Sequence, residues 1–493
     1  MINAAAQAEH NHGFHLHLHN RVREAEPFYH RAVALDPAFK EAWVNLGLAA
    51  LTQGRPEEAL SCQRQALRLD PDCADAHNNL GMAHYAMGHV AEAENCFRAS
   101  LRLRAKHPNA MLNLGSTRHI LNDLEQAEAL FRRALGLGVD LARGNSNLAL
   151  ALLQRMRPEE AERCCREALA VCPGNPEARA NLALALLLMG RMEEGWREYE
   201  ARWEGAAMGG PAPVLHQPRW TGQALNGETV LLYAEQGFGD TLQFCRYAPM
   251  VAAAGGRVVL VVPKPLRRLM TALDGVAEVR CEDDLLLPAF DYHSPLLSLP
   301  AAFGTTLQTV PAPRSYLDAD PSDWGEFLAG CPGLKVGLVW AGKSRTAQPQ
   351  AVAVDQRRSM RLTDMVPLLE VEGCSFVSLQ LGPPAAQMHW LPEGLHLQDV
   401  SGRLNDWSDT ADLIAGLDLV IAVDTAVVHL AGALGKPVWM LNRFDSCWRW
   451  LMHRDDSPWY PSMRQFRQTV PGDWDCVIQR VRDALRDWAS GVG

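Results

Sequence analysis

The sequence has no apolar run long enough to cross a bilayer, so we expect no membrane span. Residues 1–20 are rich in histidine and lack the basic-then-apolar order of a signal peptide. The twelve cysteines include no CxxC pair, which favours reduced thiols and a cytoplasmic location. Net positive charge is also missing: the formal charge of -10 disfavours nonspecific binding to nucleic acid.

What is present is an ordinary globular composition in a long chain. Apolar residues make up 48% and charged residues 21% of 493 residues, enough for two or more domains with their own cores. The composition therefore leaves the function open, and the spacing of particular residues carries the argument.

The most regular feature is a row of asparagines at a constant spacing of 34 residues, each followed by leucine. A 34-residue period is typical of the tetratricopeptide helix-turn-helix repeat. The members of this asparagine row are Asn45, Asn79, Asn113, Asn147 and Asn181.

Other residues follow the same period. With Trp43 at repeat position 4, small and aromatic residues recur at the packing and turn positions of each unit. A degenerate first unit includes Gly13 and Tyr29, and the final unit runs into Trp196 and Tyr199. The pattern resembles tetratricopeptide repeats and predicts an α-solenoid over residues 1–205.

The asparagine row is predicted to face away from the helix-packing side. At about 100° per residue, repeat positions 4, 7, 8 and 11 share one side of the first helix, and position 6 lies nearly opposite. That side lines the concave surface of a solenoid, where amides could bind the backbone of a protein or peptide acceptor. The alternative is that these asparagines bond only to neighbouring backbone or water.

The histidines near the N-terminus raise the question of a metal site. Their alternation does not suit a helix, on which ligands at i and i+4 would share a face. We therefore expect no metal there. The histidines concerned are His10, His12, His15, His17 and His19.

Glycine and proline interrupt the helical pattern at Gly209–Pro213, which predicts a linker over residues 206–225. Beyond it, short apolar runs alternate with helical stretches, as in an α/β region with parallel strands. We predict two Rossmann-like lobes, over residues 226–331 and 332–493.

Two strand-to-turn transitions mark the starts of these lobes. A strand at Thr229–Ala234 leads into a turn with Gly237 and Gly239, and a strand at Leu334–Trp340 leads to Lys343. Such glycine-rich turns let a ligand approach the backbone, and helix starts favour anions. The ligand is expected where the strands end.

A third transition lies near the C-terminus. A buried strand is predicted to end at Asp424, and a helix to start near Thr425, whose free amides suit a diphosphate. The last strand is predicted at Pro437–Leu441. The later Asp473–Asp475 run has the Asp-x-Asp spacing of a metal-binding motif, and we interpret it as surface.

The segment Leu417–Pro437 resembles the nucleotide-sugar motif of heptosyltransferase-type glycosyltransferases. Segments Glu235–Tyr247, Asp355–Ser359 and Trp448–Trp450 look like bacterial tetratricopeptide proteins with that domain. The whole is similar to O-GlcNAc transferase, in which repeats precede a GT-B catalytic region. In that enzyme a similar asparagine row contacts the acceptor peptide, which favours the same role here.

The resemblance implies roles for single residues. Asp240 would be the general base of an inverting transfer, although as a helix cap it would be merely structural. Lys343 would contact phosphate, unless it is a solvated loop residue. No metal or other cofactor is expected beside the nucleotide sugar. The expected donor-binding residues are Gly239, Lys343, Asp424, Thr425, Ala426 and His429.

One stretch departs from the related sequences. The related sequences carry Gly-Asn-Pro and a histidine soon after the strand that corresponds to Leu334–Trp340. In this chain the segment after that strand, residues 342–358, is longer and contains no such histidine. The donor, and activity itself, are open for this reason. The alternatives to a protein glycosyltransferase are a non-catalytic scaffold that binds a partner through the repeats, and a transferase for a cell-surface glycan.

Overall fold

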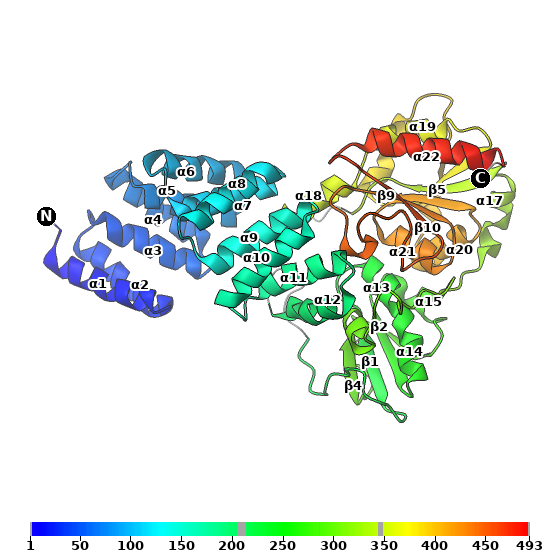
Figure 1. The fold of residues 1–493 in the computed structure, drawn as a ribbon, viewed down its shortest axis with the longest axis horizontal. Coiled ribbons are helices and arrows are strands. Elements are labelled where there is room, and N and C mark those ends of the chain that lie inside the picture. Colours follow the sequence, from blue (N-terminus) through cyan, green and yellow to red (C-terminus); the bar gives the residue numbers. More distant parts are fainter. Residues whose placement is uncertain (1, 205–212, 285, 344–348, 492–493) are drawn as a thin grey trace. The chain divides into compact units, whose positions relative to one another are not determined.

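The computed structural model describes residues 2–204, 213–284, 286–343 and 349–491 (Figure 1). The Gly209–Ala212 part of the expected linker and residues 344–348 of the unusual loop lie outside the described residues. The chain divides into two compact units. Unit 1 comprises Met1–Arg155 and Arg163–Ala178, and unit 2 comprises Met156–Glu162 and Arg179–Gly493.

The repeats form helix pairs, as the 34-residue period predicts. The α-solenoid runs from blue through cyan to green in Figure 1. Its helices are α1 (Ala4–Leu18), α2 (Val22–Leu35), α3 (Lys40–Thr52), α4 (Pro56–Leu69), α5 (Ala74–Ala86), α6 (Val90–Leu103), α7 (Pro108–Ile120), α8 (Leu124–Gly136), α9 (Leu141–Gln154), α10 (Pro158–Val171), α11 (Pro176–Leu188) and α12 (Met192–Tyr199).

Glycines in the first helix of a repeat allow the second helix to approach closely. A Cβ at Gly81 would lie 2.6 Å from the Phe97 ring, and one at Gly115 would lie 2.5 Å from the Phe131 ring. Both rings are almost completely buried. The glycines thus serve packing, because a side chain there would displace the ring that closes the pair.

The first sheet of unit 2 has four parallel strands in the order β3-β2-β1-β4. Apart from the exposed Arg257 at the start of β2, strands β1 and β2 consist of valine, leucine, threonine and tyrosine, which suits strands that are covered on both faces. The strands are β1 (Thr229–Tyr233), β2 (Arg257–Val262), β3 (Val276–Cys281) and β4 (Tyr292–Pro295).

The second sheet has six parallel strands in the order β10-β9-β8-β5-β6-β7. The strand order reverses between β5 and β8, and ligands bind at such a point in open α/β sheets. The strands are β5 (Leu334–Val339), β6 (Cys374–Ser378), β7 (Gln398–Asp399), β8 (Leu419–Val423), β9 (Val438–Asn442) and β10 (Met463–Arg467).

Helices accompany both sheets, and the buried side chains between them form apolar cores. None of the helices in the described ranges combines the length and apolarity that a bilayer crossing needs. The helices of unit 2 after the repeats are α13 (Phe238–Phe244), α14 (Ala248–Ala253), α15 (Arg267–Met270), α16 (Leu299–Ala302), α17 (Gly325–Ala329), α18 (Pro349–Arg358), α19 (Val366–Leu369), α20 (Trp407–Ala415), α21 (Ala426–Ala433) and α22 (Trp474–Ala489).

The prediction that Pro437–Leu441 is the last strand is wrong. This segment forms β9, and β10 follows it and pairs with it in parallel. The sequence of β10 contains two arginines and a glutamine in five residues, which hid its strand character. The run at Asp473–Asp475 has a structural role, because the Asp473 carboxylate accepts a hydrogen bond from the Cys476 amide (3.1 Å) at the start of α22.

The glycine contacts make a stability prediction. Gly115→Ala should lower the free energy of unfolding of unit 1 by roughly 1–3 kcal/mol, because the added methyl group overlaps the buried Phe131 ring. Gly136→Ala is the control, since a Cβ there meets nothing within 4 Å and alanine favours the helix. In urea unfolding followed by circular dichroism, the midpoint of Gly115→Ala alone should move to a lower urea concentration. Equal midpoints in Gly115→Ala, Gly136→Ala and the parent would contradict the close contact between Gly115 and Phe131.

Candidate functional site

The turn between β1 and α13 places Asp240 at the carboxyl edge of the first sheet. Gly237 is the N-cap residue of α13, and its N–H donates to Asp240 Oδ2 (2.9 Å). Gln236, just before it, has a positive φ of 62°. The Asp240 side chain, three residues into the turn, therefore caps the start of α13 by accepting this bond. This structural role does not exclude a catalytic one.

The other carboxylate oxygen of Asp240 accepts from Arg449, a buried residue that follows β9. The same guanidinium donates to Gln243 Oε1 (2.8 Å) and Cys447 Sγ (3.2 Å). Burial is the largest single influence and would lower the pKa of Arg449, but the interactions with Asp240, Cys447 and Tyr199 together outweigh it, and the pKa is raised. Asp240 and Arg449 thus form an ion pair between the two sheets.

The turn between β8 and α21 lies beside the point where the strand order reverses. Thr425 is the N-cap residue of α21, yet its side chain makes no capping bond, and its Oγ1 is buried without a hydrogen-bond partner among the described residues. Asp424 and Ala426, on either side, are partly exposed. The start of α21 therefore combines helix amides with an unpartnered hydroxyl, which is suitable for an anionic ligand.

Glycine at position 239 brings α13 and α21 together. A Cβ at Gly239 would lie 2.8 Å from His429 Cδ2 and 3.5 Å from Ala426 Cα. Asp240 is the next residue, so the turns after β1 and β8 meet here. Gly239, predicted from the first lobe, therefore lies beside Ala426 and His429, predicted from the second.

His429 itself is enclosed by aromatic rings. Its Nδ1 lies 2.8 Å from the Tyr460 hydroxyl, and its ring stacks on Trp450 at a centroid distance of 5.2 Å. Desolvation by burial lowers the pKa of His429 to about 3, although Asp424 opposes this effect. His429 is thus a neutral imidazole at neutral pH, able to donate or accept a hydrogen bond but not to supply charge.

Positive charge at the site comes from other residues. Lys343, after β5, is exposed. Arg358 donates to the Asp424 carbonyl (3.0 Å) and pairs with Asp355 (2.6 Å), and its guanidinium occupies the space that a side chain at Gly342 would need. Its Nε is buried without a partner among the described residues. Arg358 therefore lies between the turns after β5 and β8.

Sequence reasoning missed Arg358 and Arg449 as site residues. Both lie in segments that carry the family resemblance, but no role followed from the residue pattern. Arg358 contacts Asp424, 66 positions away in the chain, and Arg449 contacts Asp240, 209 positions away. Only the folded structure reveals such contacts.

The asparagine row lies on the first helices of the repeats, and three of its members bond to the preceding repeat. Asn45 Nδ2 donates to His10 Nε2 (2.8 Å), Asn113 Nδ2 to Asn78 Oδ1 (2.9 Å), and Asn147 Nδ2 to Ser116 Oγ (3.3 Å). Each bond uses only part of the hydrogen-bonding capacity of an amide. Asn45, Asn113 and Asn147 thus form contacts between repeats and keep part of their hydrogen-bonding capacity.

Two members of the row are buried and are linked by polar neighbours. Asn79 and Asn113 are 6% and 5% exposed. Asn79 Oδ1 accepts from Asn78 (3.1 Å), and Asn113 Oδ1 accepts from Arg143 (2.7 Å). A ligand would therefore reach these two amides only after displacing existing bonds.

The row also has a sixth member that the sequence reading missed. Asn11 stands 34 residues before Asn45, on α1, and is exposed. Histidine follows it where leucine follows the others, so the repeated Asn-Leu pair is broken there. The 34-residue spacing alone could have identified it.

The histidines of α1 mostly pack against aromatic rings. His10 is buried beside Phe39, with the ring centroids 4.9 Å apart, and His12 stacks on Phe28 at 4.1 Å. His17 Nδ1 lies 3.2 Å from the Tyr29 hydroxyl. These contacts give the three residues a packing role in the first repeat.

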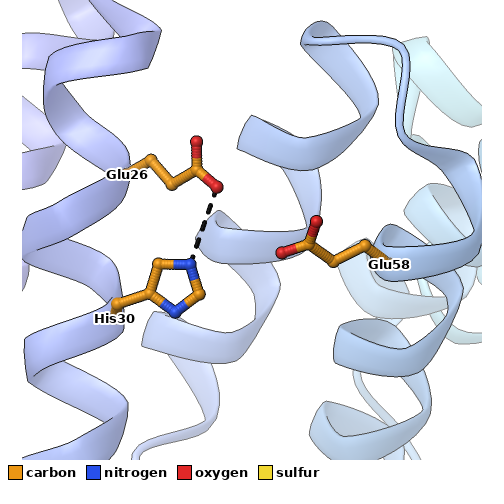
Figure 2. A group of neighbouring side chains, drawn as sticks. All are labelled: Glu26, His30 and Glu58. Atoms are coloured by element: carbon orange, nitrogen blue, oxygen red, sulfur yellow. Dashed lines mark ion pairs between the residues drawn. The ribbon is translucent and has the colours of Figure 1, made fainter.

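A different group in the repeats has the geometry of a metal site. Figure 2 shows Glu26, His30 and Glu58, whose ligand atoms lie within 4.8 Å of one another. Arg55, however, donates to Glu26 Oε1 (2.6 Å) and also pairs with Glu58. This guanidinium already pairs with both carboxylates, so the group is an ion-pair cluster.

Comparison with known proteins gives matches in both units. Residues 39–106, 78–142 and 146–211 match tetratricopeptide repeat profiles, and residues 368–449 match glycosyltransferase family 9 (heptosyltransferase). The chain thus contains tetratricopeptide repeats and a region of the heptosyltransferase family. That region includes Asp424–His429 and ends at Arg449, and it does not include Asp240.

A curated relative is Protein FlbA of Caulobacter vibrioides, 29% identical over 328 residues, which are 60% of this chain and 53% of FlbA. The matched part thus spans about half the length of that relative. Among solved structures, a thermophilic tetratricopeptide protein of Thermus thermophilus is 25% identical with a TM-score of 0.34, over 37% of this chain and 100% of that one. PilF of Pseudomonas aeruginosa is 20% identical with a TM-score of 0.33, over 40% and 95%.

The buried imidazole predicts a pH effect on stability. Below pH 6.5 the unfolded chain protonates His429 while the folded chain does not, so stability should fall from about pH 6.5 towards pH 3. Between pH 7 and pH 5 the free energy of unfolding should fall by roughly 1–2 kcal/mol less in His429→Gln than in the parent. Urea unfolding followed by tryptophan fluorescence measures this free energy at each pH. His389→Gln, at an exposed position, is the control; an identical pH slope in all three proteins would refute the prediction.

Proposed function

We propose that this protein is an inverting GT-B glycosyltransferase that transfers a sugar from a nucleotide-sugar donor to a protein hydroxyl. The observation that carries the proposal is the start of α21: an unpartnered buried Thr425 hydroxyl at a helix N-terminus, beside the reversal of strand order. The match to a glycosyltransferase family over the same residues supports it.

The donor diphosphate would lie at the turns after β5 and β8. The amides at the start of α21 and the Thr425 hydroxyl would donate to its oxygens, as helix N-termini do for phosphates. Arg358 and Lys343 would supply positive charge from the second sheet. These groups neutralise the leaving phosphate, so the proposed reaction uses no metal.

The acceptor hydroxyl would approach from the first sheet. Its oxygen forms a bond to the anomeric carbon while the bond from that carbon to the donor phosphate breaks, which inverts the configuration. Asp240 would take the hydroxyl proton. Each Asp240 oxygen already accepts one bond, from Gly237 or Arg449, and each has a second lone pair for the proton.

The repeats would recruit the acceptor as a protein rather than as a free glycan. Asn45 and Asn147 use only part of their hydrogen-bonding capacity within the repeats, and the remainder could bind an extended backbone whatever its side chains. Apolar residues at repeat positions 9 and 12, such as Met82 and Tyr85, are only partly buried and would add contact area. The proposed protein acceptor follows from this combination.

A non-catalytic scaffold is the second candidate, and the Asp240–Arg449 ion pair favours it. A carboxylate bonded to both a helix amide and a buried guanidinium has a complete set of structural contacts without substrate. Incubation with a panel of nucleotide sugars discriminates the two. If the protein neither binds nor turns over any donor, the non-catalytic scaffold is the function that stands.

The donor site makes a quantitative prediction. Arg358→Gln should weaken binding of the nucleotide diphosphate on the order of tenfold to a hundredfold, because one charge-assisted contact to phosphate is lost. Arg361→Gln is the matched control three residues later, where the side chain is 79% exposed. Isothermal titration calorimetry measures both; equal affinities in the two variants would remove Arg358 from the donor site.

The acceptor site makes a separate prediction. Replacing Asn79, Asn113 and Asn147 together by alanine should reduce transfer to the protein acceptor and leave donor hydrolysis unchanged, since all three residues lie in the repeats and outside the proposed donor site. Circular dichroism checks that the repeats remain folded. The control is Asn109→Ala with Gln126→Ala, two exposed amides of α7 and α8. A parallel loss of both activities, or of neither, would make the row structural.

A further inference from the structure

The last helix of the repeats belongs to unit 2, where it packs against the candidate site. Helix α12 and the 3-10 turn η1 (Glu200–Trp203) end the solenoid, yet Met192, Trp196 and Tyr199 of α12 belong to the apolar core of unit 2. Trp196, Tyr199 and Arg202 are each only 2% exposed. This segment therefore has a role beyond ending the repeats.

Its first set of contacts is with the turn that leads to Asp240. Arg202 donates two parallel hydrogen bonds to Glu235, both 2.8 Å, and a third to Ser298 Oγ (2.7 Å). Gln236 Nε2 donates to the Tyr199 hydroxyl (3.2 Å). Glu235 and Gln236 directly precede the Gly237 N-cap, so α12–η1 contacts both residues that determine where α13 begins.

Its second set of contacts is with the segment that contains Arg449. The Trp448 ring lies edge-on to Trp196 (5.2 Å between centroids) and to Tyr199 (6.2 Å). The guanidinium of Arg449 lies over the same Trp448 ring, 4.3 Å from its centroid. Tyr199 thus touches the turn before Asp240 with its hydroxyl and the residue before Arg449 with its ring.

We propose that the last repeat helix is a functional part of the transferase site, with Tyr199 and Arg202 as positioning residues for Asp240. The inference rests on the proposed function for its effect on turnover, but not for its effect on structure. Gln236 is in a left-handed conformation that a non-glycine residue seldom adopts, and the bond to Tyr199 is the contact that favours it. Loss of this bond should loosen the Gly237–Asp240 cap.

The experiment compares three variants of the full chain with the parent. Tyr199→Phe removes the hydroxyl and keeps the ring against Trp448, and Arg202→Lys keeps the charge but loses the two parallel bonds. The control is Arg191→Lys, an exposed arginine at the start of α12 that pairs with Glu162 and Glu194. Amide hydrogen exchange by mass spectrometry is the first measurement, because it needs no substrate.

In Tyr199→Phe and Arg202→Lys, amide exchange over residues 235–241 should accelerate on the order of tenfold, with the rest of the two sheets unchanged. With a donor that the parent turns over, kcat should fall on the order of tenfold while the donor KM stays within about twofold. Unchanged exchange over residues 235–241, equal acceleration throughout unit 2, or the same effect in Arg191→Lys would overturn the proposal.

Failure of the proposed function would look different. Suppose that the parent turns over no donor, while amide exchange over residues 235–241 accelerates in Tyr199→Phe. The positioning of Asp240 would then stand, and only the proposed catalytic activity would be rejected. Suppose instead that the parent is active and that both variants equal it in amide exchange and in kcat. The transferase activity would then stand, and the proposed role of α12 would be rejected.

Discussion

The ion pair between Asp240 and Arg449 is the constraint on which the geometry of unit 2 depends. A buried guanidinium is costly unless charge and hydrogen bonds compensate it, and removing one partner of such a pair is strongly destabilising. Because Arg449 follows β9 and Asp240 follows β1, this requirement fixes the edge of one sheet against the edge of the other. The close contact of Gly239 with His429 depends on the same approach.

A second buried arginine shows how the same unit accommodates charge without a carboxylate. Arg246 donates to three backbone carbonyls, those of Gln243, Pro311 and Trp459, and to the Tyr316 hydroxyl. Its guanidinium also lies over the rings of Tyr316 and Tyr460. Neutral acceptors and aromatic faces together satisfy the cation. The polar groups between the sheets therefore specify one arrangement.

Much of this architecture could be predicted from residue spacing, because helix pairs and buried strands have strong periodic signals. The repeat helices, strands β1, β5 and β8 and the turns with Asp240 and Asp424 were located in this way. Strand β10 was missed because its arginines disguise a buried strand face. Arg358 and Arg449 were missed as site residues because their partners are distant in sequence. Asn11 escaped notice because His12 replaces the expected leucine.

The asparagine row has a consequence for the conditions under which the repeats operate. Asparagine carries no ionisable group, so its donors and acceptors are the same at any physiological pH, and salt screens them little. Ion pairs between exposed side chains, such as Arg104 with Asp75, weaken as ionic strength rises. The amide contacts of the proposed acceptor surface would thus depend less on acidity and salt than contacts between charged side chains do.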